Sequence, residues 1–257
     1  MIGPLFHLNP LNVSRNSMSL SDFGASLLQR SGALLEIIFA DVVLTENTFI
    51  EKYIRKFKKN VKVIVRQIGI PRENIPNLLR VLNVNKDIDF LYVGGLDKLK
   101  GIEDLLKAFR AISKDHTLTI AGYGDKAWIE MLIERYNVRN VTIYTNIEEE
   151  EKFELYLKSK VYVFPSKVDG IPITFQEAWA YGCLVVTYML PTYIDIEDKI
   201  LSVPLLDIEK LREKMEYAVS HYKEYKEMLI HNYLSAVENS TEDGKVRGLD
   251  DDIKKNI

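Results

Sequence analysis

The chain has 257 residues, of which 47% are hydrophobic and 28% charged, and its formal net charge is −3. This is typical of a globular protein with a sizeable core, and at about 150 residues per domain it allows one large domain or two small ones. The acidic balance excludes a nucleic-acid binder that works through bulk positive charge, and the single cysteine excludes an internal disulfide or a cysteine-cluster metal site.

The first residues of the chain lack the basic start and long apolar core of a secretory signal. The longest apolar stretch, near residues 32–44, is interrupted by Glu36 and Asp41, so it is not expected to span a bilayer. A cytoplasmic location is therefore expected.

The front part of the chain predicts a small α/β segment. After about 20 residues of loop composition, an apolar period predicts a helix over about Phe23–Ala40. Strands are expected at Asp41–Leu44 and Val61–Val65, with a helix over residues 47–59 between them. The prolines of segment 71–76 indicate a linker, so residues 1–76 are expected to form a shortened N-terminal segment and linker.

The helix expected over residues 47–59 is amphipathic. One side carries Phe49, Ile50, Tyr53, Ile54 and Phe57, and the other carries Lys52, Arg55, Lys56, Lys58 and Lys59. A basic amphipathic helix can lie peripherally on an anionic membrane, which would suit a lipid-linked acceptor. The alternative is that its apolar side packs on the neighbouring strands.

After Lys86, strands and helices alternate without hairpin signals. Strands are expected at residues 90–93, 117–121, 141–144, 161–165 and 184–187, and helices at 101–113, 126–136, 148–157, 174–181 and 207–222. This alternation predicts an α/β fold with a Rossmann-like doubly wound parallel sheet over residues 77–222. Glycine turns are expected at Gly94–Gly95 and Gly122–Gly124, and a C-terminal helix and polar tail over residues 223–257.

Four segments that follow predicted strands occur in a characteristic order. They are Val93–Gly101, Ala121–Gly124, Val141–Tyr144 and Pro165–Gly182. In the last, Asp169 and Glu177 are separated by seven residues, and Ala178, Ala180 and Gly182 follow.

Together these segments resemble the donor-binding C-terminal lobe of the retaining family-4 glycosyltransferases, which have the two-lobed GT-B fold. The resemblance covers about residues 90–222. It implies an enzyme, a retaining hexosyltransferase-type glycosyltransferase, that moves a sugar from a nucleotide-sugar such as a UDP- or GDP-sugar to an acceptor. The acceptor class stays open among glycans, lipids and proteins.

Breaking a nucleotide-sugar bond places negative charge on a diphosphate, which fixed cations and amide donors must stabilise. By the resemblance, Lys100 is the leaving-group cation, Asp169 binds the transferred sugar, and both belong to the catalytic site. Glu177 would accept hydrogen bonds from the ribose hydroxyls. The remaining donor-binding positions implied by the resemblance are Gly94, Gly95, Gly122, Gly124, Gly170, Ile171, Pro172 and Ile173. The structural alternatives are a solvated lysine at a helix start and an exposed helical glutamate.

Several positions depart from the family pattern. Gly95 stands where the family commonly has arginine, so Lys98 is the nearest cation that could replace it. Asp169 replaces the usual glutamate, Ile171 an aromatic residue and Pro172 a glycine, which removes an amide donor. The resemblance implies no metal and no other cofactor, because Lys100 and helix amides would carry the charge.

Two other interpretations stay open. The chain could bind a nucleotide-sugar without turnover, as a subunit whose acceptor lobe comes from a partner chain or from a second copy in a homodimer. Residues 1–76 amount to about half of a ~150-residue lobe, which favours this interpretation. The third is an unrelated doubly wound nucleotide-binding domain.

Overall fold

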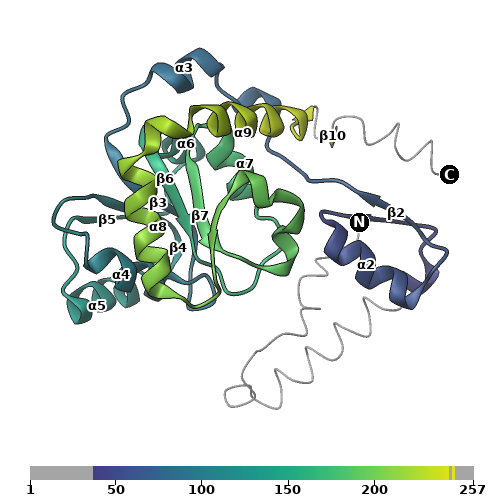
Figure 1. Ribbon diagram of the computed structural model, residues 1–257, viewed down its shortest axis with the longest axis horizontal. Helices are drawn as coiled ribbons and strands as arrows, with labels where there is room; N and C mark the ends of the chain where they lie inside the picture. Colours follow the sequence, from purple (N-terminus) through teal and green to yellow (C-terminus); the bar gives the residue numbers. More distant parts are fainter. Residues whose placement is uncertain (1–36, 243–244, 247–257) are drawn as a thin grey trace, which may run out of the picture. The chain divides into compact units, whose positions relative to one another are not determined.

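The computed structural model describes residues 37–242 and 245–246 (Figure 1). The chain divides into a smaller unit, residues 1–67 with 248–257, and a larger unit, residues 68–247. Of the loop and helix expected before residue 41, only residues 37–40 are described, and residues 37–39 are helical. The rest of that expectation lies outside the described residues.

The described part of the smaller unit is a β-α-β motif. Strands β1 (Val42–Thr45) and β2 (Lys62–Val65) pair in parallel and flank α2 (Thr48–Phe57). The helix begins after Asn47, whose Oδ1 accepts the Ile50 amide at 2.9 Å, as expected of an N-cap.

The apolar side of α2 packs inside this unit. Ile54 is fully buried with Val43 and Val61, and Ile50 packs against the same cluster. Of the two interpretations of this helix, the structure therefore shows packing on the strands for Ile50 and Ile54, whereas Phe57 is 48% exposed. Among residues 37–242 and 245–246, no helix has the length and apolarity needed to cross a membrane.

The larger unit is built on a six-stranded parallel sheet in the order β5-β4-β3-β6-β7-β8. Its strands are β3 (Ile88–Leu96), β4 (Leu118–Gly124), β5 (Val141–Thr145), β6 (Ser159–Phe164), β7 (Leu184–Tyr188) and β8 (Leu201–Val203). Counted from β3, this is the 3-2-1-4-5-6 order of the Rossmann fold. The predicted fold class is confirmed.

Helices cover both faces of this sheet. The helices of the larger unit are α3 (Leu78–Asn83), α4 (Ile102–Arg110), α5 (Lys126–Tyr136), α6 (Glu149–Lys158), α7 (Ile173–Ala180), α8 (Ile208–Ser220) and α9 (Lys226–Glu238). Helix α4 contacts α5 and α8, while α7 contacts α6 and α9, as right-handed crossovers in opposite directions require (Figure 1). Every residue of β7 is buried, because both of its faces are covered.

The glycine turns expected after β3 and β4 are corrected by the structure. Gly94 and Gly95 lie inside β3, and Gly122 and Gly124 lie inside β4. The two strands pair through these positions, with Gly94 opposite Gly122. Glycine signals a turn locally, but here the neighbouring strand supplies ladder partners that keep the chain extended.

The ends of the larger unit also differ from the expected boundaries of 77 and 222. The Gly69 amide donates to the Asn239 carbonyl at 2.9 Å, and the Thr241 amide donates to the Ile70 carbonyl at 3.0 Å. These bonds join the linker to the end of α9, so the unit begins at residue 68. Helix α9 packs on α7, and the expected polar tail contributes the short antiparallel strands β9 (Thr241–Glu242) and β10 (Lys245–Val246).

Three 3₁₀ segments complete the described chain, at Arg72–Asn74, Pro191–Lys199 and Tyr222–Tyr225. The first lies in the expected linker. The second follows β7 and leads to β8, so it begins at the edge of the sheet where the strands end. It adds residues to this carboxyl edge that no periodic pattern in the sequence indicated.

A charged cluster joins three strands at their amino ends. Asp89 accepts from the Lys160 ammonium at 2.7 Å and from the Thr117 amide at 3.2 Å, and His116 Nδ1 lies 3.3 Å away. Burial acts to raise the pKa of Asp89, but these hydrogen bonds outweigh it and hold the pKa below its ordinary value.

We expect Asp89→Asn to lower the free energy of unfolding by about 1–2 kcal/mol at pH 7. Because the folded-state pKa is lowered, this stability is present above the unfolded pKa of 3.8 and is lost as pH falls through the folded value. Urea unfolding at pH 7 and pH 3.5 should therefore show a penalty that shrinks at the lower pH. A penalty of equal size at both would contradict a role for the ionised carboxylate.

Candidate functional site

The candidate site lies where the direction of winding reverses. Strands β3 and β6 are neighbours, but the chain leaves them toward opposite edges of the sheet. Ligands of doubly wound folds bind at this crevice, beyond the carboxyl ends of the strands. The loops that follow β3 and β6 carry Lys100 and Asp169, so the topology brings the two predicted catalytic residues to one place.

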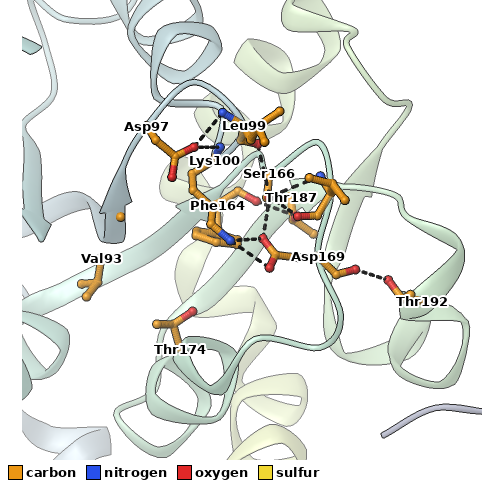
Figure 2. Close-up of polar contacts among 12 residues, drawn as sticks. Val93, Asp97, Leu99, Lys100, Phe164, Ser166, Asp169, Thr174, Thr187 and Thr192 are labelled. Carbon is orange, nitrogen blue, oxygen red and sulfur yellow. Dashed lines mark hydrogen bonds and ion pairs between the residues drawn. The ribbon is translucent and has the colours of Figure 1, made fainter. Parts of the chain in front are cut away.

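Lys100 and Asp169 form an ion pair across this crevice. The Lys100 ammonium lies 2.9 Å from each carboxylate oxygen of Asp169, and it also lies over the Phe164 ring, 5.9 Å from its centre (Figure 2). The side chains are 29% and 20% exposed, so the pair is accessible to a ligand. Lys100 is thus not the freely solvated lysine of the structural alternative.

The loop that carries Lys100 is shaped by its own acid. Asp97 Oδ1 accepts the amides of Leu99 at 2.8 Å and Lys100 at 3.1 Å (Figure 2). Gly101 then adopts φ +77°, a left-handed conformation that glycine allows, and α4 begins.

Asp169 is held from both ends. The Ser166 hydroxyl donates to its Oδ2 at 2.6 Å, and the Thr192 hydroxyl donates to its backbone carbonyl at 2.7 Å (Figure 2). Ser166 is fully buried, and Thr192 comes from the segment after β7. The carboxylate is therefore fixed before any ligand binds.

The predicted glycines lie on the β3–β4 side of the crevice. A Cβ at Gly122 would fall 1.9 Å from the Gly94 carbonyl oxygen, so glycine is required for this close approach. A Cβ at Gly95 would instead meet the Asp97 carboxylate at 3.3 Å and the Tyr123 ring at 3.9 Å. An acid and an aromatic ring therefore border the position where the family commonly has arginine.

The segment after Asp169 leads into the amino end of α7. Gly170 and Ile171 are buried, so the Ile171 side chain belongs to the core and only its backbone can serve a ligand. Pro172 is the N-cap and offers no polar side chain, and Ile173, the first helical residue, is half exposed. The first turn carries no acid, so the helix dipole and its amides suit an anion.

Glu177 is the buried member of a second ion pair. It is 5% exposed, and its Oε1 accepts from the Lys152 ammonium of α6 at 2.7 Å. The alternative of an exposed helical glutamate is therefore wrong.

The charge of Glu177 acts on the hydroxyls of three tyrosines. Burial raises the pKa of Tyr156 well above its ordinary value, and the Glu177 charge adds to the effect. Burial likewise raises the pKa of Tyr162 and Tyr181, with the Glu177 charge a smaller cause in each. These hydroxyls therefore stay protonated at neutral pH.

Sequence reasoning missed four residues that shape the site: Asp97, Lys152, Ser166 and Thr192. For Lys152 a signal was present, because it is a lysine at the start of a helix whose dipole disfavours it. No local signal distinguishes Ser166 or Thr192, since each acts through a contact that folding creates. Lys98, the cation expected to replace an arginine at Gly95, is exposed.

In the part of the chain that the structure describes, no three His, Cys, Asp or Glu side chains gather in a way that could hold a metal ion.

Residues 74–233 match the family model described as glycosyl transferases group 1. An uncharacterised glycosyltransferase of Haemophilus influenzae is 28% identical over 197 residues, which cover 72% of this chain and 52% of that protein. The chain therefore spans about half the length of this curated relative.

Solved glycosyltransferases share the fold at low identity. A sucrose-phosphate synthase from Thermosynechococcus elongatus has a TM-score of 0.66 at 22% identity, covering 83% of this chain and 57% of its own. The pneumococcal O-GlcNAc transferase solved with UDP and GlcNAc has a TM-score of 0.68 at 15% identity, covering 89% and 47%. The family model matches more than half of the chain. The Rossmann-like sheet, which is like that of GT-B enzymes, is consistent with this match. The chain belongs to the glycosyl transferases group 1 family.

Proposed function

We propose that this chain takes part in transferring a glycosyl group from a nucleotide-sugar to an acceptor hydroxyl with retention of configuration. The observation that carries the proposal is the Lys100–Asp169 pair at the crevice between β3 and β6. In it, a cation for the leaving diphosphate and an acid for the sugar hydroxyls stand 2.9 Å apart.

In this proposal Lys100 and the amino end of α7 receive the diphosphate. Both supply positive charge at the same edge of the sheet, the first as an ammonium and the second as amide N–H groups. The diphosphate competes with Asp169 for the ammonium, so Asp169 becomes free to accept hydrogen bonds from the sugar. No metal is needed for this charge balance.

The transfer step needs no separate base. The bond between the anomeric carbon and the phosphate oxygen breaks, and its electron pair stays on the phosphate. The acceptor oxygen bonds to the same face of the anomeric carbon, and its proton passes to the departing phosphate. Lys100 stabilises the negative charge that builds on that phosphate before the proton arrives. The acceptor is proposed as a hydroxyl of a glycan, lipid or protein.

A second candidate function is nucleotide-sugar binding without turnover, with the acceptor lobe supplied by a partner chain or a second copy. The space beside Gly95 favours it, because Asp97 and Tyr123 stand there instead of a cation. A carboxylate beside a diphosphate weakens its binding, and weak stabilisation of the leaving group slows transfer.

Titration calorimetry with a panel of UDP- and GDP-sugars tests the proposal. We expect Lys100→Ala to weaken binding of the preferred donor by about 10-fold to 100-fold, the value of a charge-assisted contact. Glu177→Ala should also weaken it, and Lys158→Ala, an exposed lysine at the carboxyl end of α6, serves as the matched control with less than about 3-fold change.

Nucleotide release then separates the two candidate functions. Release of UDP or GDP with retained anomeric configuration in the product supports the enzyme. Binding that depends on Lys100 but never leads to nucleotide release with any candidate acceptor supports the binding subunit. Unchanged affinity in both Lys100→Ala and Glu177→Ala removes the proposed site.

A further inference from the structure

The two segments that carry Lys100 and Asp169 are joined by a further ion pair. Asp104 lies in the first turn of α4, and its Oδ2 lies 3.1 Å from the ammonium of Lys167. In addition, the Lys167 amide donates to the Leu99 carbonyl at 2.9 Å. The same two segments are therefore held together by a backbone hydrogen bond and two ion pairs, one of which is the proposed catalytic pair.

The Asp104–Lys167 pair is anchored in the core at its acidic end. The side chain of Asp104 is 7% exposed, whereas that of Lys167 is 30% exposed. Tyr188, the last residue of β7, donates its hydroxyl to the same oxygen of Asp104 at 3.1 Å. Burial raises the pKa of Tyr188 well above its ordinary value, and the Asp104 charge adds to the shift, so the hydroxyl stays a donor at neutral pH. Because a buried carboxylate without a cation carries a large desolvation cost, Lys167 is held at Asp104.

The order of the charges favours one way of pairing the two segments. In each segment a lysine precedes an acid, Lys100 before Asp104 and Lys167 before Asp169. The observed pairs join the lysine of each segment to the acid of the other. In the opposite arrangement the two lysines would face each other, and so would the two acids. Like charges that face each other repel, so the pattern selects the observed register.

Buried polar contacts connect the two ion pairs. The Ser166 hydroxyl, which donates to Asp169 Oδ2 at 2.6 Å, lies 3.4 Å from the Leu99 carbonyl oxygen (Figure 2). That carbonyl also accepts the amide of Lys167, the next residue. A shift of Lys167 relative to Leu99 therefore moves the hydroxyl that holds the Asp169 carboxylate.

We propose that Asp104 and Lys167 are positioning residues, whose ion pair fixes how the two segments of the candidate site lie against each other. This inference rests on the proposed function, because it takes Lys100 and Asp169 as the groups that meet the donor. Asp104 follows Lys100 by four residues and Lys167 precedes Asp169 by two, so each acts through the backbone. A misplacement of about 1 Å at a reacting group can cost about 100-fold.

The first test needs no ligand. Hydrogen exchange of the Lys167 backbone amide measures how firmly its segment is held at the Leu99 carbonyl. We expect Asp104→Asn, which keeps the size of the side chain but removes its charge, to speed this exchange by at least about 10-fold. Tyr188→Phe is the matched control, because it removes the other hydrogen bond to the same carboxylate oxygen and lies in neither segment. It should change the exchange by less than about 3-fold.

The second test is a double-mutant cycle on donor binding, measured by calorimetry with the full chain. For the nucleotide-sugar that binds most tightly, Lys167→Met should weaken binding by about 10-fold. Adding Lys100→Ala to that variant should cost less than about 3-fold, because a displaced ammonium contributes little. Lys167→Arg should bind within about 3-fold of the unmodified chain, since a guanidinium also pairs with a carboxylate.

Three outcomes would overturn the inference. The first is unchanged exchange of the Lys167 amide in Asp104→Asn. The second is equal effects of Asp104→Asn and Tyr188→Phe, which indicate a role in stability alone. The third is additive losses from Lys167→Met and Lys100→Ala, which indicate that Lys167 contacts the donor directly and leave the proposed function standing.

The exchange experiment keeps the inference separate from the proposed function. If no nucleotide-sugar binds to the unmodified chain, the proposed function fails, and exchange alone decides whether the Asp104–Lys167 pair sets the register. Should Asp104→Asn not fold, Lys167→Met takes its place, and the amide at position 167 is followed. Faster exchange there supports the inference, and unchanged exchange overturns it.

Discussion

Alanine in place of Gly101 is expected to lower the free energy of unfolding by about 3 kcal/mol. The residue has φ +77°, where a side chain costs about 1–2 kcal/mol, and its new Cβ would fall 1.9 Å from the Pro165 carbonyl oxygen. Backbone on both sides must then move apart, which adds about 1–3 kcal/mol. Urea unfolding followed by tryptophan fluorescence measures the change, because both tryptophans, Trp128 and Trp179, lie in the larger unit.

The same substitution should also reach the site. Pro165 opens the loop that carries Asp169, and Gly101 follows Lys100, so the clash separates the two members of the ion pair. Donor affinity should fall by at least about 10-fold in a variant that is still folded at 10 °C. Gly95→Ala is the matched control for the loss of stability, because its Cβ would meet only side-chain atoms, the nearest at 3.3 Å. A stability loss below 1 kcal/mol in Gly101→Ala would contradict this account.

Lys86→Met is expected to lower the free energy of unfolding by about 2–4 kcal/mol. The ammonium donates to the carbonyls of Leu157 at 3.0 Å, Ser159 at 2.8 Å and Tyr181 at 2.9 Å. All three carbonyls lie at the carboxyl ends of α6 and α7, where a cation also complements the helix dipole. Methionine fills the volume but leaves all three carbonyls without this donor.

The pH dependence separates the charge from the packing at this position. Burial lowers the pKa of Lys86 below 10.5 in the folded chain, although the nearby Cys183 opposes the shift. At pH values between the lowered folded-state pKa of Lys86 and 10.5, the folded state binds fewer protons than the unfolded state. The free energy of unfolding therefore rises as the pH approaches 10.5. The difference between the unmodified chain and Lys86→Met should therefore widen with pH. The exposed Lys158→Met should change stability by less than about 0.5 kcal/mol at every pH.

The order of elements in the larger unit follows from local signals. Apolar runs of strand length alternate with 3.6-residue periods, and this alternation is enough to predict a parallel sheet covered on both faces. The expected helix over residues 126–136 coincides with α5, whose N-cap Asp125 accepts the Trp128 amide at 3.1 Å. The elements that were missed, such as α3 and β8, are short and carry too few residues to show a period.

The sequence by itself determined the doubly wound class and the presence of Lys100, Asp169 and Glu177 in segments that follow or flank strand ends. Only the tertiary structure decided which charges meet. Lys100 pairs with Asp169, 69 residues away, and Lys152 pairs with Glu177, 25 residues away. The physical reason is that backbone periodicity is a local property, while an ion pair depends on how neighbouring strands and helices place the loops and turns that carry its two members.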